Sequence, residues 1–193
     1  MALSVSQTEA AQSPLRPRYF GIAVLALAIM MAAIVRANFW FLNFVHVFAG
    51  LLWTGIDLFM GFVVGPVMRQ SPVETRRSMT AGLVPRTLVL MPTLSIITST
   101  SGWFLAVQLG YLNVGYPEFW WVIAALGIIT VLTIQGLGIL LPTNLRLYYE
   151  IQKPVPDDMK ISHWMRAYLG VVAVQGTMQV LIIVVMTRFR AGL

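Results

Sequence analysis

Long apolar stretches alternate with short polar ones along this chain. The apolar stretches lie at about residues 19–36, 39–68, 83–111, 118–141 and 163–187. Each is close to or above the ~20 residues that a helix needs to cross the hydrocarbon core of a bilayer. They lack the residue-by-residue alternation of barrel strands. The pattern therefore predicts an all-α integral membrane bundle with five transmembrane helices, in one domain covering residues 19–190.

Prolines are expected to shape the ends of these helices. Pro66 and Pro142 stand near the carboxyl ends of the second and fourth stretches, and Pro85 stands in the expected first turn of the third. A proline removes a backbone donor and clashes with the preceding turn, so it favours a helix boundary. Pro92 falls inside the third stretch, where we expect a kink.

The amino-terminal residues 1–18 contain Ser, Gln, Pro and two arginines without an apolar period. They are predicted to form a disordered cytoplasmic tail. A signal peptide is the alternative for the first apolar stretch. Arg36 stands where a small-residue cleavage site would be needed, so we expect a retained helix.

Composition agrees with a membrane protein and limits its chemistry. Hydrophobic residues make up 58% of the 193 positions and charged residues 10%, which is far from the average of soluble domains. The chain has no cysteine, so disulfides, thiolate metal sites and cysteine nucleophiles are excluded. The net charge of +6 comes from residues beside membrane segments, which indicates lipid contact and loop placement rather than nucleic-acid binding.

The distribution of basic residues predicts the orientation. With the amino terminus inside, only Arg36, Arg188 and Arg190 of the 13 Lys and Arg residues fall outside. Cytoplasmic loops carry an excess of Lys and Arg. We therefore expect a multi-pass protein of a bacterial-type inner (cytoplasmic) membrane, with its amino terminus in the cytoplasm.

The second apolar stretch carries the most informative pattern. Its polar, small and aromatic residues recur at steps of three or four, which puts them on one face of a helix. These residues are His46, Gly50, Trp53, Asp57, Gly61 and Gly65. An imidazole and a carboxyl group are costly at hydrocarbon depth and usually mark function. The face is predicted to meet other helices or a cofactor.

His46 is the candidate metal ligand, as an axial ligand of haem b. Gly50, one turn away, is expected to leave room for the flat macrocycle, and Trp53 to form part of its wall. The alternative is a buried histidine that is hydrogen-bonded to a neighbouring helix. His163, the other histidine, belongs to the opposite membrane face, roughly 25 Å away in depth, so both cannot bind one haem in one subunit.

Further residues that would contact this haem are proposed only from their expected depth in the membrane. Arg36 and Asn38 are expected at the same outer surface as His46, where they would pair with the haem propionates. The sixth iron ligand would be Met178 or Met186 of the last helix, or would be absent.

The segment HVFAGLLWTG, His46-x-x-x-Gly50-x-x-Trp53-x-Gly55, resembles a first-helix motif of small helical membrane proteins. These are the amino-terminal membrane part of bacterial membrane-bound urate oxidases, the copper-resistance D-type proteins and the membrane protoporphyrinogen oxidases. The resemblance implies haem b or a metal at the histidine. It covers about ten residues closely. This chain has no second histidine at matching depth, which argues against two-histidine ligation and against a copper site.

Asp57 is the only acidic residue expected deep in the membrane. Two structural roles are open for it: an ion pair with Arg86, or hydrogen bonds to the hydroxyls that follow Pro92. The functional alternative is a proton relay. Those hydroxyls are expected to bond mainly within their own helix, and Gln135, Gln175 and Gln179 to link helices by hydrogen bonds.

Three functions remain open from these residues, and whether the protein is an enzyme is not decided by them. The leading hypothesis is a haem-b-associated redox or electron-transfer protein that exchanges electrons with a partner at the outer face. The alternatives are a non-catalytic membrane subunit of a larger complex and a small transporter that uses Asp57. The expected partners are the lipid bilayer and either other membrane subunits or further copies of the chain.

Overall fold

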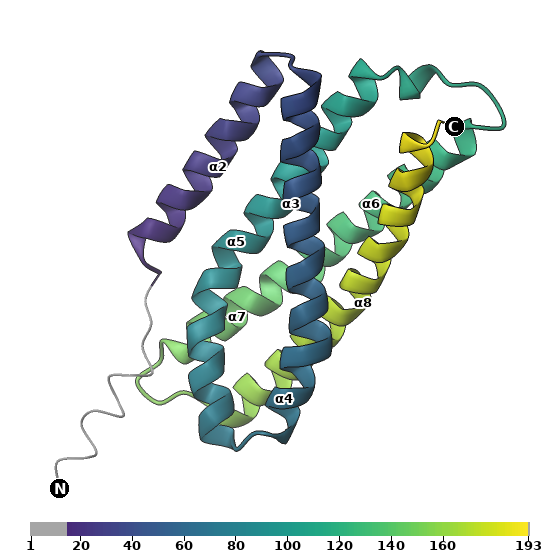
Figure 1. Cartoon of the computed structure of the whole chain (residues 1–193). Coiled ribbons are helices and arrows are strands. Elements are labelled where there is room, and N and C mark those ends of the chain that lie inside the picture. Colours follow the sequence, from purple (N-terminus) through teal and green to yellow (C-terminus); the bar gives the residue numbers. More distant parts are fainter. Residues whose placement is uncertain (1–14, 193) are drawn as a thin grey trace, which may run out of the picture.

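The computed structural model describes residues 15–192, which form helices joined by short turns (Figure 1). In chain order the elements are α2 (Pro17–Val35), α3 (Phe39–Phe59), η1 (Met60–Val64), α4 (Gly65–Gln70), α5 (Val73–Gln108), η2 (Tyr111–Asn113), α6 (Phe119–Gln135), η3 (Gly136–Leu140), α7 (Leu141–Ile151) and α8 (Asp158–Arg190). Within this part of the chain there is no strand, and five helices are long and apolar enough to cross a membrane. The predicted fold class, an all-α membrane bundle, is confirmed.

Two of the five long helices pass through a proline that was expected to end them. α3 continues through η1 into α4 as far as Gln70, and α6 continues through η3 into α7 as far as Ile151. Both η segments are π-helical turns, and Pro66 and Pro142 lie in the first turn after them. A π turn widens the helix, so it accommodates the proline ring and its missing donor without a break.

Three helices begin earlier than predicted. α5 starts at Val73 rather than near residue 83, so Pro85 lies inside the helix. α2 starts at Pro17, a residue suited to a first helical position because its backbone needs no donor there. α8 starts at Asp158, where the Asp157 carboxylate accepts hydrogen bonds from the backbone N–H groups of Met159 and Lys160. Of the predicted tail 1–18, residues 1–14 lie outside the described part.

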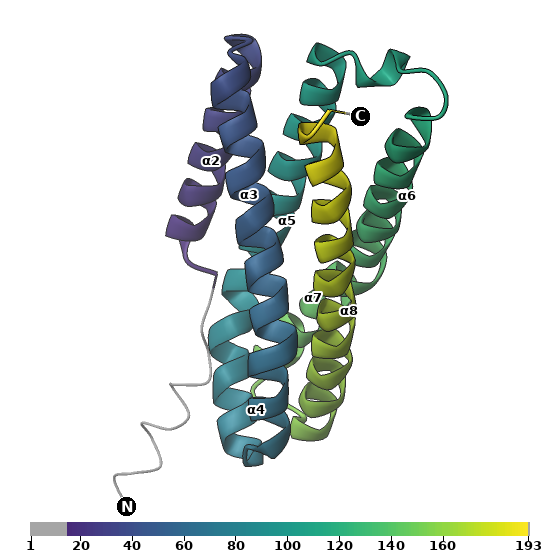
Figure 2. The same cartoon turned by 45° about the vertical axis from the view of Figure 1, so that its right-hand side comes forward.

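The helices form one bundle in which α3 packs against α5 and α8 (Figures 1 and 2). α2 lies along α5 on one side, and α6 lies along α8 on the other. Buried apolar side chains form two clusters. One, around Met60, Val84 and Leu147, fills the end that holds the α4–α5 turn; the other, around Leu42, Trp53 and Ile97, fills the opposite half.

Two glycines bring α8 unusually close to the helix that carries Asp57. A Cβ on Gly61 would lie 2.5 Å from Ala173 Cα, and one on Gly176 would lie 3.1 Å from the Leu58 backbone nitrogen. Only glycine leaves space for backbones at such distances, as in other small-residue contacts between membrane helices. This crossing places Asp57 directly against the middle of α8.

Candidate functional site

His46 connects α3 to α5 through its imidazole. Its Nδ1 lies 2.9 Å from the Thr98 carbonyl oxygen and 3.3 Å from the Ser101 hydroxyl. A carbonyl oxygen only accepts hydrogen bonds, so we assign the ring proton to Nδ1. Nε2 is then the unprotonated nitrogen, and it has no hydrogen-bond partner in residues 15–192. This is the tautomer that a histidine needs to bind a metal through Nε2.

Gly102 of α5 holds the imidazole in place. A Cβ on Gly102 would lie 2.7 Å from His46 Cε1 and 3.1 Å from Nδ1. The ring therefore occupies the space that any other residue at this position would fill. The backbone of α5 thus supports His46 in two ways, by the Thr98 carbonyl and by the gap at Gly102.

The space beside Gly50 is used for helix packing. A Cβ on Gly50 would lie 3.4 Å from Thr98 Cγ2, which is van der Waals distance. The predicted room for a macrocycle at this glycine is therefore filled by α5. A planar group bound to Nε2 would have to lie outside the contact between α3 and α5.

The other residues proposed around a haem take ordinary structural positions. Trp53 is buried in the apolar cluster around Leu42 and Ile97, and Met178 packs against the same cluster. Arg36 is exposed at the end of α2. The Asn38 side chain accepts a hydrogen bond from the Phe41 backbone N–H at 2.9 Å and so caps α3. These four side chains are not gathered around His46 by any contact that the structure describes.

The two histidines lie at opposite ends of the bundle. His46 is near the start of α3, and His163 is exposed near the start of α8. Because α3 and α8 begin at opposite ends (Figure 1), the histidines do not share a site. Residues 15–192 contain no group of three or more His, Cys, Asp or Glu side chains that would hold a metal ion by themselves.

Asp57 forms the centre of a second polar site. It is 1% exposed, and its Oδ2 accepts a hydrogen bond of 2.9 Å from Nε2 of Gln175, which is 2% exposed. The side chains of Trp53 and Gln179 face the same carboxyl group. Gln179 is also 2% exposed, but neither of its amide atoms has a hydrogen-bond partner, and Gln175 Oε1 has none either.

Buried polar residues continue from Asp57 toward the α4–α5 end. Tyr168 of α8 is buried on the side that faces Thr87 of α5. The Thr87 hydroxyl accepts a hydrogen bond of 3.1 Å from Asn144 Nδ2, and Asn144 Oδ1 has no partner. α3, α5, α7 and α8 thus each contribute a polar side chain to the interior.

Neither structural partner predicted for Asp57, Arg86 or a hydroxyl after Pro92, is bonded to it in the described residues; Gln175 is. Arg86 is exposed and donates to the Gly82 carbonyl in its own helix, so the expected ion pair is not formed. Arg86 lies on the exposed side of α5, whereas its neighbours Val84 and Thr87 are buried, which explains why it does not reach inward. Gln175 does link two helices, as expected, because it donates to Asp57 across the contact between α8 and α3.

Two of the five hydroxyls from Ser95 to Ser101, after Pro92, bond within α5, as predicted, whereas the buried Thr98 hydroxyl has no partner in residues 15–192. Ser95 donates to the Pro92 carbonyl and Ser101 to the Ile97 carbonyl. The role of the Thr98 carbonyl could not be predicted, because every residue has a backbone carbonyl. Tyr168, Thr87 and Asn144 were also missed, since isolated polar residues in apolar helices have no spacing that links one helix to another.

No family model, no curated protein and no solved structure matches this chain significantly. The short resemblance around His46 therefore stands on those residues alone, and function has to be argued from the two polar sites.

Proposed function

We propose that this multi-pass membrane protein is a haem-b-associated redox protein in which His46 Nε2 binds the iron. One observation carries the proposal: the Nδ1 nitrogen is engaged by the Thr98 carbonyl at 2.9 Å while Nε2 has no partner in the described residues. Haem-ligating histidines are oriented in this manner, by a hydrogen bond from the nitrogen that does not bind the metal.

The features that fit a haem are the proposed iron ligand His46 and the two α5 groups that orient its ring. Gly102 and Thr98 fix the ring, and the hydrogen bond from Nδ1 raises the basicity of Nε2. Bound haem would supply one-electron chemistry to a partner. Since the space at Gly50 is filled, we propose that the group lies between α3 and a second membrane chain, either another subunit or another copy.

The absorption spectrum of the purified protein tests this proposal. Protein produced with a haem supply should show a Soret band, and an α band after reduction with dithionite. His46→Ala should remove both bands, while the matched control His163→Ala should keep them. Absence of the bands from the wild-type protein would contradict the redox proposal and would favour a non-catalytic membrane subunit.

A second candidate function, ion translocation through the bundle, is favoured by the Asp57 site. Unpartnered amide atoms in a membrane interior cost free energy, and they are found where water or an ion passes. Gln175 and Gln179 supply such atoms beside the buried Asp57 carboxyl group. Tyr168 and Thr87 extend the polar interior from there.

Flux measurements in proteoliposomes test this second candidate. A pH-sensitive dye inside the vesicles should report proton entry with the wild-type protein. Asp57→Asn keeps the size of the side chain but cannot ionise, so entry should stop. Asp158→Asn, which removes a carboxylate at the first residue of α8, should leave proton entry intact. Equal flux in the wild type and Asp57→Asn would argue against translocation.

The position of the protein in the cell is part of the proposal. We propose a bacterial-type inner membrane, with the amino terminus and the α4–α5 and α7–α8 connections in the cytoplasm. The excess of arginine and lysine at those connections supports this orientation.

A further inference from the structure

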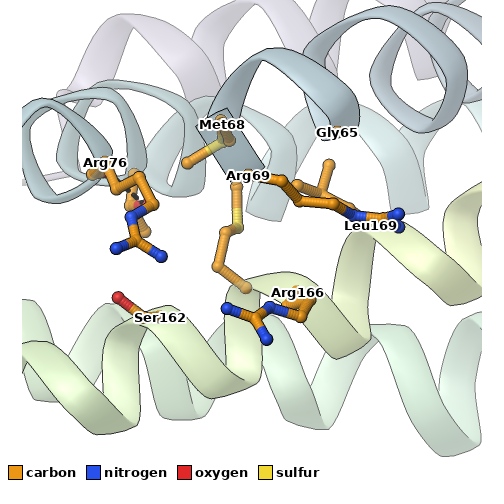
Figure 3. A pocket seen from close by; sticks show the side chains of 9 residues that line it. Gly65, Met68, Arg69, Arg76, Ser162, Arg166 and Leu169 are labelled. Atoms are coloured by element: carbon orange, nitrogen blue, oxygen red, sulfur yellow. Dashed lines mark hydrogen bonds between the residues drawn. The ribbon is translucent and has the colours of Figure 1, made fainter. Parts of the chain in front are cut away.

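Three arginines from three helices line one pocket at the α4–α5 end of the bundle. They are Arg69 of α4, Arg76 of α5 and Arg166 of α8. Arg76 and Arg166 extend toward the pocket from opposite walls, with the Ser162 hydroxyl beside Arg76, whereas Arg69 runs along one wall toward Leu169 (Figure 3). The cavity itself is small, about 20 Å³, and it is partly open to the surroundings.

The charge of this pocket is not balanced by the protein. None of its lining residues is acidic. In residues 15–192 the ion pairs are Arg77 with Asp158, Lys153 with Glu150 and Lys160 with Asp157, so none involves these three arginines. Arg76 Nε is buried and has no hydrogen-bond partner. Like charges held together at a low-dielectric boundary repel one another unless an anion lies between them.

The position and walls of the pocket indicate what that anion is. Arg69 lies in the last turn of one membrane-crossing helix, and Arg76 lies in the first turns of the next. This is the depth of lipid headgroups. The remaining wall includes Met68 and Leu169, which suit the apolar part of a lipid. A phosphodiester offers oxygens to guanidinium forks and to a serine hydroxyl.

We propose that this pocket binds the phosphate group of an anionic phospholipid, held by Arg76, Arg166 and Ser162, with Arg69 adding positive charge. Basic pockets between membrane helices bind such headgroups elsewhere. The site is independent of His46 and of Asp57, so it stands whichever function is correct.

Binding of defined lipids to the full-length protein in neutral detergent tests the proposal. Native mass spectrometry should detect retained phosphatidylglycerol, and thermal unfolding should shift upward with it, but not with phosphatidylcholine. Losing two charge-assisted contacts in the double variant Arg76→Gln/Arg166→Gln should weaken phosphatidylglycerol binding by about tenfold or more.

Three comparisons decide the outcome. Arg188→Gln removes one charge at the other end of α8 and should leave binding unchanged; an equal loss there would overturn the proposal in favour of general charge attraction. Inorganic phosphate that protects as well as the lipid would overturn it in favour of a soluble anion. Ser162→Ala keeps every charge, and a several-fold loss with an unchanged helical spectrum would support a built site even if the double variant fails to fold.

Discussion

A polar side chain buried in a membrane protein cannot form hydrogen bonds with bulk water, so its protein partners decide whether it stabilises the fold. His46 and Asp57 both have partners, but of different kinds. The imidazole relies on a carbonyl and a glycine of α5, and the carboxyl group relies on one amide of α8. Each arrangement leads to a prediction that a single substitution can test.

Gly102→Ala should displace the His46 ring. The new methyl group would meet Cε1 at 2.7 Å, which real atoms do not tolerate, so the ring must move and its bond to the Thr98 carbonyl weakens. We expect a loss of about 1–3 kcal/mol in the free energy of unfolding. Chemical unfolding in mixed micelles, followed by circular dichroism, measures it.

Gly127→Ala is the matched control for that change. No atom lies within 4 Å of the added Cβ, and alanine favours a helix over glycine by up to ~1 kcal/mol. Stability should therefore stay equal or rise. A Gly102→Ala protein as stable as this control would show that the ring is not held as described.

Gln175→Met and Gln179→Met should differ although they lie one turn apart and are equally buried. The first change removes the amide that donates to Asp57 Oδ2 at 2.9 Å, so it should cost about 1–3 kcal/mol. The second removes two amide atoms that have no partner, so it should cost less than ~1 kcal/mol or stabilise. Unfolding of the two variants in the same micelles makes the comparison, and equal losses would contradict the asymmetry.

At the scale of elements, the closest approach of α8 to η1 is at Gly61. Gly61→Ala would place a methyl group 2.5 Å from Ala173 Cα, and backbone atoms cannot yield as a flexible side chain can. The two helices must separate, so we expect a loss of about 1–3 kcal/mol or more. Gly55→Ala, in the same long helix with nothing within 4 Å, should be tolerated; thermal unfolding of both variants measures the difference.

The start of α8 should respond to acid through Asp157. The hydrogen bond from the Lys160 backbone N–H, together with that residue's ammonium group, holds the pKa of the Asp157 carboxyl below its ordinary value. Because the folded-state pKa is lowered, the stability it contributes is present above the ordinary pKa and fades as the pH falls through the lowered one.

Asp157→Asn keeps a capping side chain but removes the charge. The wild-type protein should therefore be more stable than this variant at neutral pH, and the difference should vanish in acid. Thermal midpoints measured from pH 7 downward give the test. A difference that persists at low pH would mean that the charge of Asp157 is not its source.

The five membrane helices were predictable because each needs only a long apolar run, and every run is visible in the sequence. The residues at which these helices begin and end were harder to predict. Pro66 and Pro142 indicated breaks, but each follows a π-helical turn. The local sequences GFVVGP and LGILLP do not predict such a turn. α5 begins ten residues before the predicted start, and in that added part the Thr80 hydroxyl, whose residue type suggested a loop, donates to the Arg76 carbonyl of its own helix.

The candidate sites were predictable only in part, for a related reason. His46 and Asp57 were conspicuous, since such groups are rare in lipid. Their partners belong to other helices, and packing angles decide which side chains meet. Arg86 was the obvious partner for Asp57 by charge, yet it lies on the exposed face of α5, and a neutral glutamine takes its place.

For the whole molecule, the orientation in the membrane decides two things. It decides which leaflet supplies lipid to the arginine pocket, and on which side of the membrane the proposed electron partner of His46 lies. The chain contains no cysteine, so a single introduced thiol reports on its own surroundings. Val155, in the α7–α8 connection, and Asn113, in the α5–α6 connection, are both exposed and lie at opposite ends of the bundle (Figure 1). Ten of 13 basic residues favour the Val155 end as cytoplasmic.

In intact cells a membrane-impermeant maleimide should thus label Asn113→Cys but reach Val155→Cys only after the membrane is opened. The reverse pattern would place the arginine pocket outside and would move His46 to the cytoplasmic half, where its electron partner would have to be a cytoplasmic protein.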